Sequence, residues 1–281
     1  MEIIMAPKAG FCFGVRRAVE LTERTVSAAT GPVATLGPLI HNPAVVASLA
    51  SRGVRVVDSP AEAEAGTLII RSHGAPPAVI AEAEARGLTV IDATCPFVRK
   101  AQRLARRLAD AGYQVVVLGD PGHPEIKAVT AAAGDALVIP AAGAIDLGAL
   151  RKRVGLVCQT TLAPEPLARA AALLAPACRE LVVHNTICTA TFERQQGALA
   201  LAQQVEAMVV VGGRESANTA HLAELCRAVV PTRQVEHPGE LDPQWFAGCR
   251  LVGITAGAST PVEQIEAVRR RLAEMAQEGR P

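Results

Sequence analysis

The 281-residue chain has few aromatic side chains and almost no net charge, and each shortage argues against a class of function. Aromatic residues make up 2% of the sequence, too few for surfaces that stack nucleic-acid bases. The 28 Lys and Arg residues nearly balance the 27 Asp and Glu residues, so the net charge is +1. A chain with so little positive charge lacks the electrostatic footprint of nucleic-acid or acidic-membrane binding. We therefore expect neither nucleic acid nor a membrane as a partner.

The chain also lacks a long hydrophobic run and a secretory signal. Lys8 interrupts the apolar N-terminal segment before it reaches the length of a signal peptide. The weakly polar stretch 128–150 contains Asp135, Pro140 and Asp146, which exclude it as a membrane span. Hydrophobic residues nevertheless make up 50% of the sequence, enough for a folded core. We expect a cytoplasmic protein, with a monomer as the default.

Two familiar cofactor signatures are missing. No pair among the seven cysteines has the C-x-x-C spacing of zinc ribbons and thioredoxin-like sites. In a reducing compartment an odd set of thiols favours metal binding, catalysis or core packing over disulfides. The G-x-G-x-x-G spacing of dinucleotide sites is absent too, so electrons for any redox chemistry would have to come from a partner.

Three of the cysteines begin the same local pattern, which recurs along the chain. Cys12, Cys95 and Cys188 each follow a short strand-like segment and a polar turn, and each precedes a predicted helix. The residues after Cys12 and Cys95 agree in register, with a valine, a basic pair and an alanine in both copies. The copy after Cys188 is weaker. This pattern predicts an internal threefold repeat.

The agreement continues beyond the cysteines, because each next predicted strand ends at a glycine. These glycines are Gly37, Gly119 and Gly212. Continuous apolar strands separated by alanine-rich helices are typical of parallel sheets covered on both faces. We predict an α/β protein of three pseudo-repeated units, at residues 1–93, 94–186 and 187–281. One large doubly wound sheet is the alternative.

The repeated cysteines lie where an α/β sheet binds ligands, beyond the carboxyl ends of its strands. Three units facing one another would bring Cys12, Cys95 and Cys188 to one point. Three protein ligands leave one coordination position open for chemistry, and thiolates favour zinc, copper(I) or iron–sulfur clusters. One [4Fe-4S] cluster per chain with a free fourth iron fits best. The other four cysteines are interpreted as core or inert surface; they are Cys158, Cys178, Cys226 and Cys249.

Polar residues at the ends of the predicted strands are mostly hydrogen-bond donors. They are His41, Asn42, His73, His123, Glu125, Gln159, Thr160, Thr161, Ser216, Asn218 and Ser259. Taken singly, each is also typical of a turn, a helix cap or a strand. Together they predict a pocket for a compact anion, such as a diphosphate or a carboxylate, held by directed hydrogen bonds. Burial and nearby negative charge would keep Glu125 protonated, which makes it the natural general acid.

Eight segments in this order resemble the 4-hydroxy-3-methylbut-2-enyl diphosphate reductase family, the last enzyme of the non-mevalonate isoprenoid pathway. They are AGFCFGVRRA (9–18), LIHNPAVV (39–46), RSHG (71–74), DATCP (92–96), GHPE (122–125), QTT (159–161), NTIC (185–188) and TAGAS (255–259). The resemblance covers nearly the whole chain.

This resemblance implies a three-unit α/β trefoil around a central [4Fe-4S] cluster. Cys12, Cys95 and Cys188 would be its ligands, and the fourth iron would bind the allylic hydroxyl of (E)-4-hydroxy-3-methylbut-2-enyl diphosphate. Reductive dehydroxylation would give isopentenyl and dimethylallyl diphosphate, with an external one-electron donor of ferredoxin or flavodoxin type. Glu125 would donate protons, and Thr160 and His123 would also be catalytic. The residues expected to bind substrate are His41, His73, His123, Thr160, Thr161, Ser216, Ala217, Asn218 and Ser259.

One position departs from the family, and two other functions stay open. The family usually has Ser-Ser-Asn where this chain has Ser216-Ala217-Asn218, so a backbone N–H would have to replace one hydroxyl. A non-redox iron–sulfur enzyme similar to quinolinate synthase is the first alternative, and the His, Ser and Asn donors argue against it. An inactive iron–sulfur sensor is the second, and it would be expected to lose Glu125 or Thr160.

Overall fold

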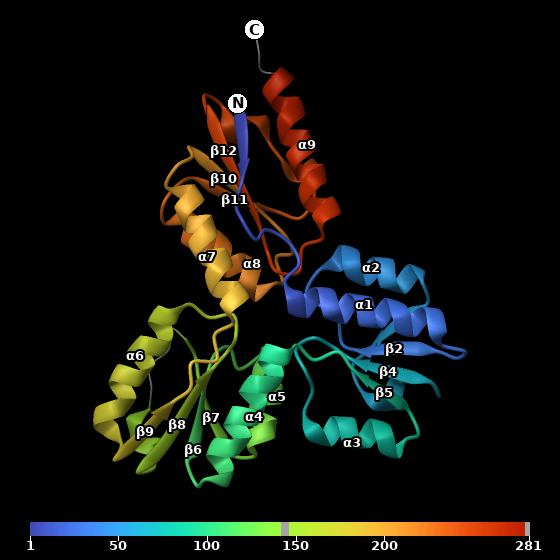
Figure 1. The fold of residues 1–281 in the computed structure, drawn as a ribbon, viewed down its shortest axis with the longest axis vertical. Coiled ribbons are helices and arrows are strands. Elements are labelled where there is room, and N and C mark those ends of the chain that lie inside the picture. The colour runs from blue at the N-terminus through green and yellow to red at the C-terminus, as the bar shows by residue number, and fades with distance from the viewer. Residues whose placement is uncertain (142–145, 279–281) are drawn as a thin grey trace. The chain divides into compact units, whose positions relative to one another are not determined.

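The computed structural model describes residues 1–141 and 146–278, and its strands form three four-stranded parallel sheets (Figure 1). Within these ranges no helix is both long and apolar enough to cross a membrane. Residues 142–145 of the weakly polar stretch 128–150 and the predicted limit at 281 lie outside the described residues.

Each sheet is built from strands close in sequence, with one exception. Sheet A contains β10 (Ala207–Val211), β11 (Thr232–Val235), β12 (Leu251–Ala256) and the first strand of the chain, β1 (Glu2–Met5). Sheet B contains β2 (Val33–Leu36), β3 (Val54–Val57), β4 (Thr67–Ile70) and β5 (Thr89–Asp92). Sheet C contains β6 (Gln114–Leu118), β7 (Ala136–Ile139), β8 (Arg153–Cys158) and β9 (Glu180–Val183).

The helices connect these strands in the manner of parallel sheets, where each crossover needs a helix. The α-helices are α1 (Phe13–Ala28), α2 (Pro43–Ser51), α3 (Pro77–Ala85), α4 (Pro96–Asp110), α5 (Pro124–Ala133), α6 (Pro164–Leu174), α7 (Thr189–Ala202), α8 (Ala217–Arg227) and α9 (Val262–Glu278). Short 3-10 helices are η1 (Pro60–Glu62), η2 (Leu147–Ala149), η3 (Ala175–Ala177), η4 (Pro238–Glu240) and η5 (Pro243–Phe246).

The three sheets share one strand order. Sheet B runs β3-β2-β4-β5 and sheet C runs β7-β6-β8-β9, so in both the first two strands exchange places. Sheet A runs β11-β10-β12-β1, which is the same order with β1 as its fourth strand. Glu2 pairs with Leu251 and Met5 with Ile254. The predicted threefold α/β repeat is therefore confirmed, and the alternative of one large sheet is wrong.

By its contacts the chain divides into two compact units. Unit 1 comprises Met1–Arg16, His41–Ala47 and Thr189–Pro281, and it contains sheet A. Unit 2 comprises Arg17–Ile40 and Ser48–Cys188, and it contains sheets B and C. The predicted boundaries at 93 and 186 stay a prediction, as does the arrangement of the repeats around a common centre.

Sheets A and C are buried on both faces, as continuous apolar strands require. In sheet C, Val115 and Val117 of β6 pack with residues of α4 and α5, whereas Val116 and Leu118 pack with α6. In sheet A the same alternation separates a cluster under α9 from a cluster under α7 and α8. Alternate residues of a strand point to opposite faces, so each sheet serves two hydrophobic clusters.

The predicted glycines follow β2, β6 and β10, at places where a side chain would collide with a polar residue. A Cβ on Gly119 would lie 2.8 Å from Oε1 of Gln159, and a Cβ on Gly212 would lie 2.5 Å from Oγ1 of Thr260. The Arg71 side chain fills the equivalent space at Gly37. All three neighbours follow the third strand of their sheet. Glycine there lets polar side chains gather at the carboxyl edge of each sheet.

Candidate functional site

The three repeated cysteines occupy equivalent places in the three sheets. Each lies in the loop between the fourth strand of a sheet and the next helix, as the sequence predicts. Each backbone N–H donates to the carbonyl two residues beyond the third strand of the same sheet. These bonds run from Cys12 to Ala258 (3.1 Å), from Cys95 to Ser72 (2.9 Å) and from Cys188 to Thr160 (2.9 Å). The fold therefore fixes all three cysteine backbones at the carboxyl edges of their sheets.

Helix N-termini adjoin these cysteines. The N–H of Val15, in the first turn of α1, donates to Sγ of Cys12 at 3.5 Å. Cys95 is the N-cap of α4, and Cys188 is buried immediately before α7. The positive end of a helix dipole stabilises a thiolate, and thiolates are the ligands that iron–sulfur clusters prefer. The chemistry of this donor set fits an iron–sulfur cluster.

A buried arginine supports the Cys12 loop and was not singled out by the sequence. Arg194 of α7 is 3% exposed, and its Nη2 donates to the carbonyl of Gly10 at 2.7 Å. Gly197, one turn later, packs against Pro7. Its neighbour Glu193 is also charged, so the local sequence neither marks Arg194 as buried nor identifies its partner. Arg194 positions the backbone two residues before Cys12.

Glu125 and Thr160 form a buried pair in unit 2. The Oγ1 of Thr160 lies 2.8 Å from Oε2 of Glu125, and the N–H of Thr160 donates to Oε1 at 2.6 Å. Glu125 is 1% exposed and Thr160 is 4% exposed. Because α5 begins at Pro124 and β8 ends at Cys158, the pair joins the start of a helix to the end of a neighbouring strand.

Burial sets the protonation of this carboxyl group. Desolvation raises the pKa of Glu125 to about 7, although the two hydrogen bonds from Thr160 act to lower it. The side chain can therefore both hold and release a proton near neutral pH, as a general acid must. The expectation that Glu125 is held protonated is supported by desolvation.

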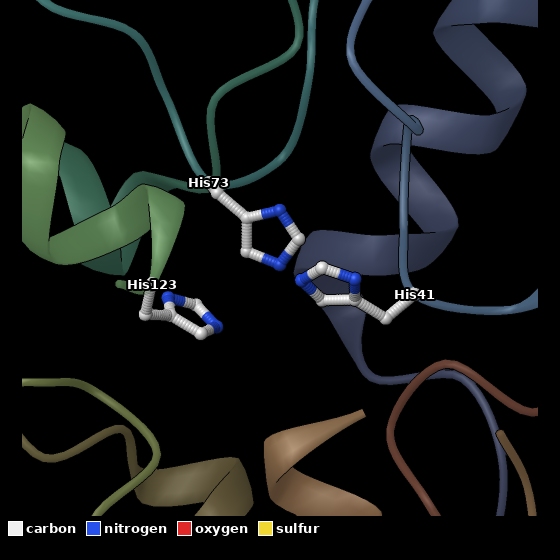
Figure 2. A group of neighbouring side chains, drawn as sticks. All are labelled: His41, His73 and His123. Atoms are coloured by element: carbon white, nitrogen blue, oxygen red, sulfur yellow. The ribbon is translucent and has the colours of Figure 1, made fainter. Parts of the chain in front are cut away.

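His123 caps the same helix and faces His73. The Nδ1 of His123 accepts from the N–H of Glu125 at 3.1 Å, so a neutral ring carries its proton on Nε2. The rings of His73 and His123 meet edge to face with centroids 5.2 Å apart. Figure 2 shows the two side chains as neighbours. Two imidazoles side by side offer ring N–H donors, which suit a compact anion better than a hydrophobic ligand.

His41 lies in a short loop of unit 1 that several polar contacts hold in place. Ser259 donates to the carbonyl of His41 at 3.2 Å. Asn42, 1% exposed, caps α2 by accepting from the N–H of Val45 and donates to Oε1 of Gln264 at 3.1 Å. Gln264 also donates to the backbone of Glu236. Sequence reasoning missed Gln264, whose helical position carries no local sign of this contact.

The start of α8 supplies further donors in unit 1. Ser216 is its N-cap and accepts from the N–H of Thr219 at 3.4 Å. Asn218 is 8% exposed, and its amide nitrogen has no hydrogen-bond partner within the described part of the chain. The buried Oγ1 of Thr219, which the sequence did not suggest, also lacks one there. Buried donors without partners indicate an absent acceptor, which at a helix N-terminus suits an anion.

Two other substrate-binding predictions have less structural support. Ala217 opens α8 with an exposed methyl group. Thr161 accepts from the amide of Gln159 at 3.2 Å, and the Gln159 carbonyl oxygen accepts from the N–H of Asp120 at 3.1 Å. Thr161 is thus held in the loop after β8 beside Thr160.

The four remaining cysteines lie outside the repeated frame. Cys226 is buried in α8, and burial raises the pKa of its thiol to about 11. Cys158 is buried at the end of β8, where its Sγ lies 3.3 Å from Oγ1 of Thr186 and burial raises its pKa. Cys178 and Cys249 are partly buried. Protonated, buried thiols of this kind behave as small hydrophobic groups.

Comparisons with known proteins agree with one another. The sequence profile described as LytB protein matches residues 3–273. The 4-hydroxy-3-methylbut-2-enyl diphosphate reductase of Anaeromyxobacter sp. (strain Fw109-5) is 45% identical over 272 residues, which cover 95% of each chain. The reductase of the same name from Geobacter sulfurreducens (strain ATCC 51573 / DSM 12127 / PCA) is 45% identical over 277 residues, with 98% of each chain covered.

Two solved structures share the fold. A structure described as (E)-4-hydroxy-3-methyl-but-2-enyl diphosphate reductase, the terminal enzyme of the non-mevalonate pathway, has a TM-score of 0.74 and 40% identity, and the match covers 98% of this chain and 100% of that one. The E-1-hydroxy-2-methyl-but-2-enyl-4-diphosphate reductase of Plasmodium falciparum has a TM-score of 0.89 and 25% identity, with 96% and 87% covered.

Proposed function

The chain belongs to the LytB protein family of 4-hydroxy-3-methylbut-2-enyl diphosphate reductases, terminal enzymes of the non-mevalonate pathway, and we propose how its own residues perform this reduction. The substrate is an allylic diphosphate. Two electrons and two protons break its C–O bond, form a C–H bond and release water. Isopentenyl or dimethylallyl diphosphate results, depending on which end of the allyl group takes the proton. This activity replaces the quinolinate-synthase-like and sensor alternatives.

Cys12, Cys95 and Cys188 would hold one [4Fe-4S] cluster per chain. Their support is the equivalent backbone geometry of the three loops and the thiolate donor set at helix N-termini. When bound, the cluster supplies single-electron transfer and, at an iron without a protein ligand, Lewis acidity toward the substrate hydroxyl.

Glu125 would supply the proton that leaves with the hydroxyl group as water, and Thr160 would relay it. With its Oε1 engaged by the Thr160 N–H, a protonated Glu125 carries its hydrogen on Oε2, next to Oγ1 of Thr160. A threonine hydroxyl accepts and donates at once, so Oγ1 can take this proton while passing its own outward. The Glu125–Thr160 contact is the observation that carries this part of the proposal.

The diphosphate would be bound by neutral donors rather than by lysines. The residues proposed to bind it are His41, His73, His123, Thr160, Thr161, Ser216, Asn218 and Ser259. Ala217 would contribute through its backbone N–H, the first of α8. The unpartnered amide nitrogen of Asn218 is the main support for this assignment.

The decisive test is turnover under anaerobic conditions. The reconstituted protein, (E)-4-hydroxy-3-methylbut-2-enyl diphosphate and reduced methyl viologen should yield both isomeric diphosphates, detected by mass spectrometry, and iron analysis should find close to four irons per chain. Zinc alone, or no product from a fully loaded protein, would contradict the proposed site.

A further inference from the structure

Helix α4 carries far more positive charge than any other helix. Its 15 residues include five cations and one acid, a net charge of +4, whereas the whole chain has a net charge of +1. No other α-helix within the described ranges exceeds +1. The net charge of this one helix thus exceeds the net charge of the whole chain.

These cations occupy one face of α4. At about 100° per residue, the five positions fall within an arc of roughly 120°. They are Arg99, Lys100, Arg103, Arg106 and Arg107, and all are exposed. The opposite side is buried in sheet C through Val98, Ala101, Ala105 and Leu108. We call the five exposed residues the basic face of α4.

Three cations of the basic face have no ion pair within the described part of the chain. Arg99 pairs with Asp92 at 2.6 Å and Arg106 with Asp110 at 2.8 Å, and no such contact exists for Lys100, Arg103 and Arg107. Their spacing of three and four residues places them side by side. Like charges so placed destabilise a helix slightly. Arg107 gains from the helix dipole in the last turn, but helix stability does not explain Lys100 and Arg103.

In helix α9, by contrast, the positive charges are balanced by negative ones. It also carries three arginines, but four glutamates accompany them. Arg269 pairs with Glu266 at 2.8 Å, and Arg271 lies 3.2 Å from Glu274 and 3.0 Å from Glu278. The excess of cations on α4 is therefore specific to this helix and is not shared by the arginine-rich helix α9.

The basic face begins beside one of the proposed cluster ligands. Cys95 is the N-cap of α4, so Lys100 and Arg103 lie about one to two helical turns beyond it. Arg17 of α1 adds a further cation there, because its Nη1 donates to the carbonyl of Thr94 at 3.3 Å. The positive surface thus starts next to the thiolate and extends along the helix.

We propose that the basic face of α4, with Arg17, is the docking surface for an acidic one-electron carrier protein of ferredoxin or flavodoxin type. This inference rests on the proposed function. Each turnover consumes two electrons, so two reduced carriers each give up one electron and leave oxidised. The chain itself has no dinucleotide fingerprint.

Charge complementarity is the argument for this occupant. Electron-transfer complexes have small interfaces and exchange rapidly, and opposite charges on the two partners mainly accelerate their encounter. A single helical face with five exposed cations, three of them without an ion pair in the described residues, on a nearly neutral protein suits a small and transient interface of this kind. Nucleic acid would need a broader basic surface, which the net charge of +1 does not provide.

The test combines a binding measurement with two electron donors. The holoenzyme variant K100Q/R103Q/R107Q should bind a purified acidic ferredoxin about tenfold more weakly at low salt, measured by fluorescence anisotropy. The KM for this ferredoxin should rise by a similar factor, while turnover with reduced methyl viologen, which needs no docking, should stay unchanged. Added salt should weaken wild-type binding toward that of the variant.

A matched control variant tests whether ferredoxin binding depends on the location of the cations or only on the total charge of the protein. K152Q/R227Q/R270Q also removes three exposed cations that have no ion pair in the described residues, but none lies on α4, and this variant should keep wild-type binding. Three outcomes would overturn the docking proposal. The α4 variant could keep its ferredoxin affinity, or the control variant could lose as much affinity as the α4 variant. The protein could also bind RNA or anionic vesicles but not ferredoxin. Absence of viologen-driven turnover in the wild type would instead contradict the proposed function.

Discussion

Thr160 holds both carboxylate oxygens of Glu125, one through its backbone N–H at 2.6 Å and one through its hydroxyl at 2.8 Å. The same residue accepts the N–H of Cys188 on its carbonyl at 2.9 Å. One residue thus connects the proposed acid to a loop that carries a proposed cluster ligand. Movement of that loop would therefore reach the proton donor through a single residue, Thr160.

Removing the acidic proton of Glu125 should slow the reaction without unfolding the protein. In Glu125→Gln the side chain keeps its shape, but it cannot transfer a proton, so kcat should fall by a factor on the order of 10² or more. Iron content and substrate affinity should remain. Glu165→Gln is the control, since Glu165 also follows a proline at the start of a helix but is exposed. Wild-type turnover in Glu125→Gln would remove this residue from the mechanism.

The pH profile should report the raised pKa of Glu125. Burial raises this pKa to about 7, so the acid form predominates below pH 7 and is lost above it. We expect kcat to decline as pH rises through 7, measured with reduced methyl viologen. A plateau extending to pH 9 would contradict the assignment.

The same shift makes stability depend on pH. Between the ordinary value of 4.5 and about 7, the folded state keeps a proton that the unfolded state has lost, so stability falls as pH rises through this window. The loss is on the order of 3 kcal/mol. In thermal unfolding experiments the melting temperature of the wild type should therefore fall as pH rises through this window. Glu125→Gln should lack this contribution to the pH dependence, because its neutral amide has nothing to titrate.

Thr160→Val tests the relay separately from the acid. The valine removes the hydroxyl but keeps the backbone N–H bond to Glu125, so we expect kcat to fall by about tenfold to a hundredfold. The hydroxyl bond acts to lower the pKa of Glu125, and its loss should move the decline in kcat to higher pH. Thr160→Ser should restore both properties. A serine variant as slow as the valine variant would point to packing instead.

Loss of any repeated cysteine should remove iron, whereas loss of a buried bystander should not. Cys12→Ser, Cys95→Ser and Cys188→Ser should each lower bound iron and abolish turnover, because a hard hydroxyl replaces a soft thiolate. Cys226→Ala, at a buried position on α8, should keep close to the wild-type iron content. Anaerobic iron and sulfide analysis of the four variants measures this difference, and iron loss in Cys226→Ala would contradict the assignment.

Ala217→Ser restores the hydroxyl that the family usually has at this position. Since Ala217 opens α8 with an exposed side chain, the change should not disturb packing. One added hydrogen bond to the charged diphosphate is worth about 1.5 kcal/mol, so KM should fall by about tenfold with kcat unchanged. An unchanged KM would show that the backbone N–H already serves this oxygen.

Local patterns in the sequence were sufficient for much of the fold. Strand-forming segments, alanine-rich helices and the glycines after β2, β6 and β10 depend on short-range sterics and on the period of apolar residues, which any stretch of sequence displays. The cysteine frames and the family segments repeat these local signals. The threefold α/β repeat could therefore be predicted, together with the residues that follow each strand.

Contacts between distant residues could not be predicted in the same way. Gln264 meets Asn42 across 222 positions, and Arg194 meets Gly10 across 184. No local signal marks either partner, because such bonds depend on which strand ends come together.

The sequence by itself determined the repeated strand–helix units, the positions of Cys12, Cys95 and Cys188 within them, and the chemical character of the donors. Only the tertiary structure decided that β1 completes sheet A beside β12 and that Glu125 is buried against Thr160, 35 residues away. The physical reason is that composition and periodicity are local, whereas strand pairing and desolvation arise from segments far apart in the chain. The sequence predicted that Glu125 holds a proton, but the extent of its burial and its bonds to Thr160, which together set its pKa, belong to the second kind.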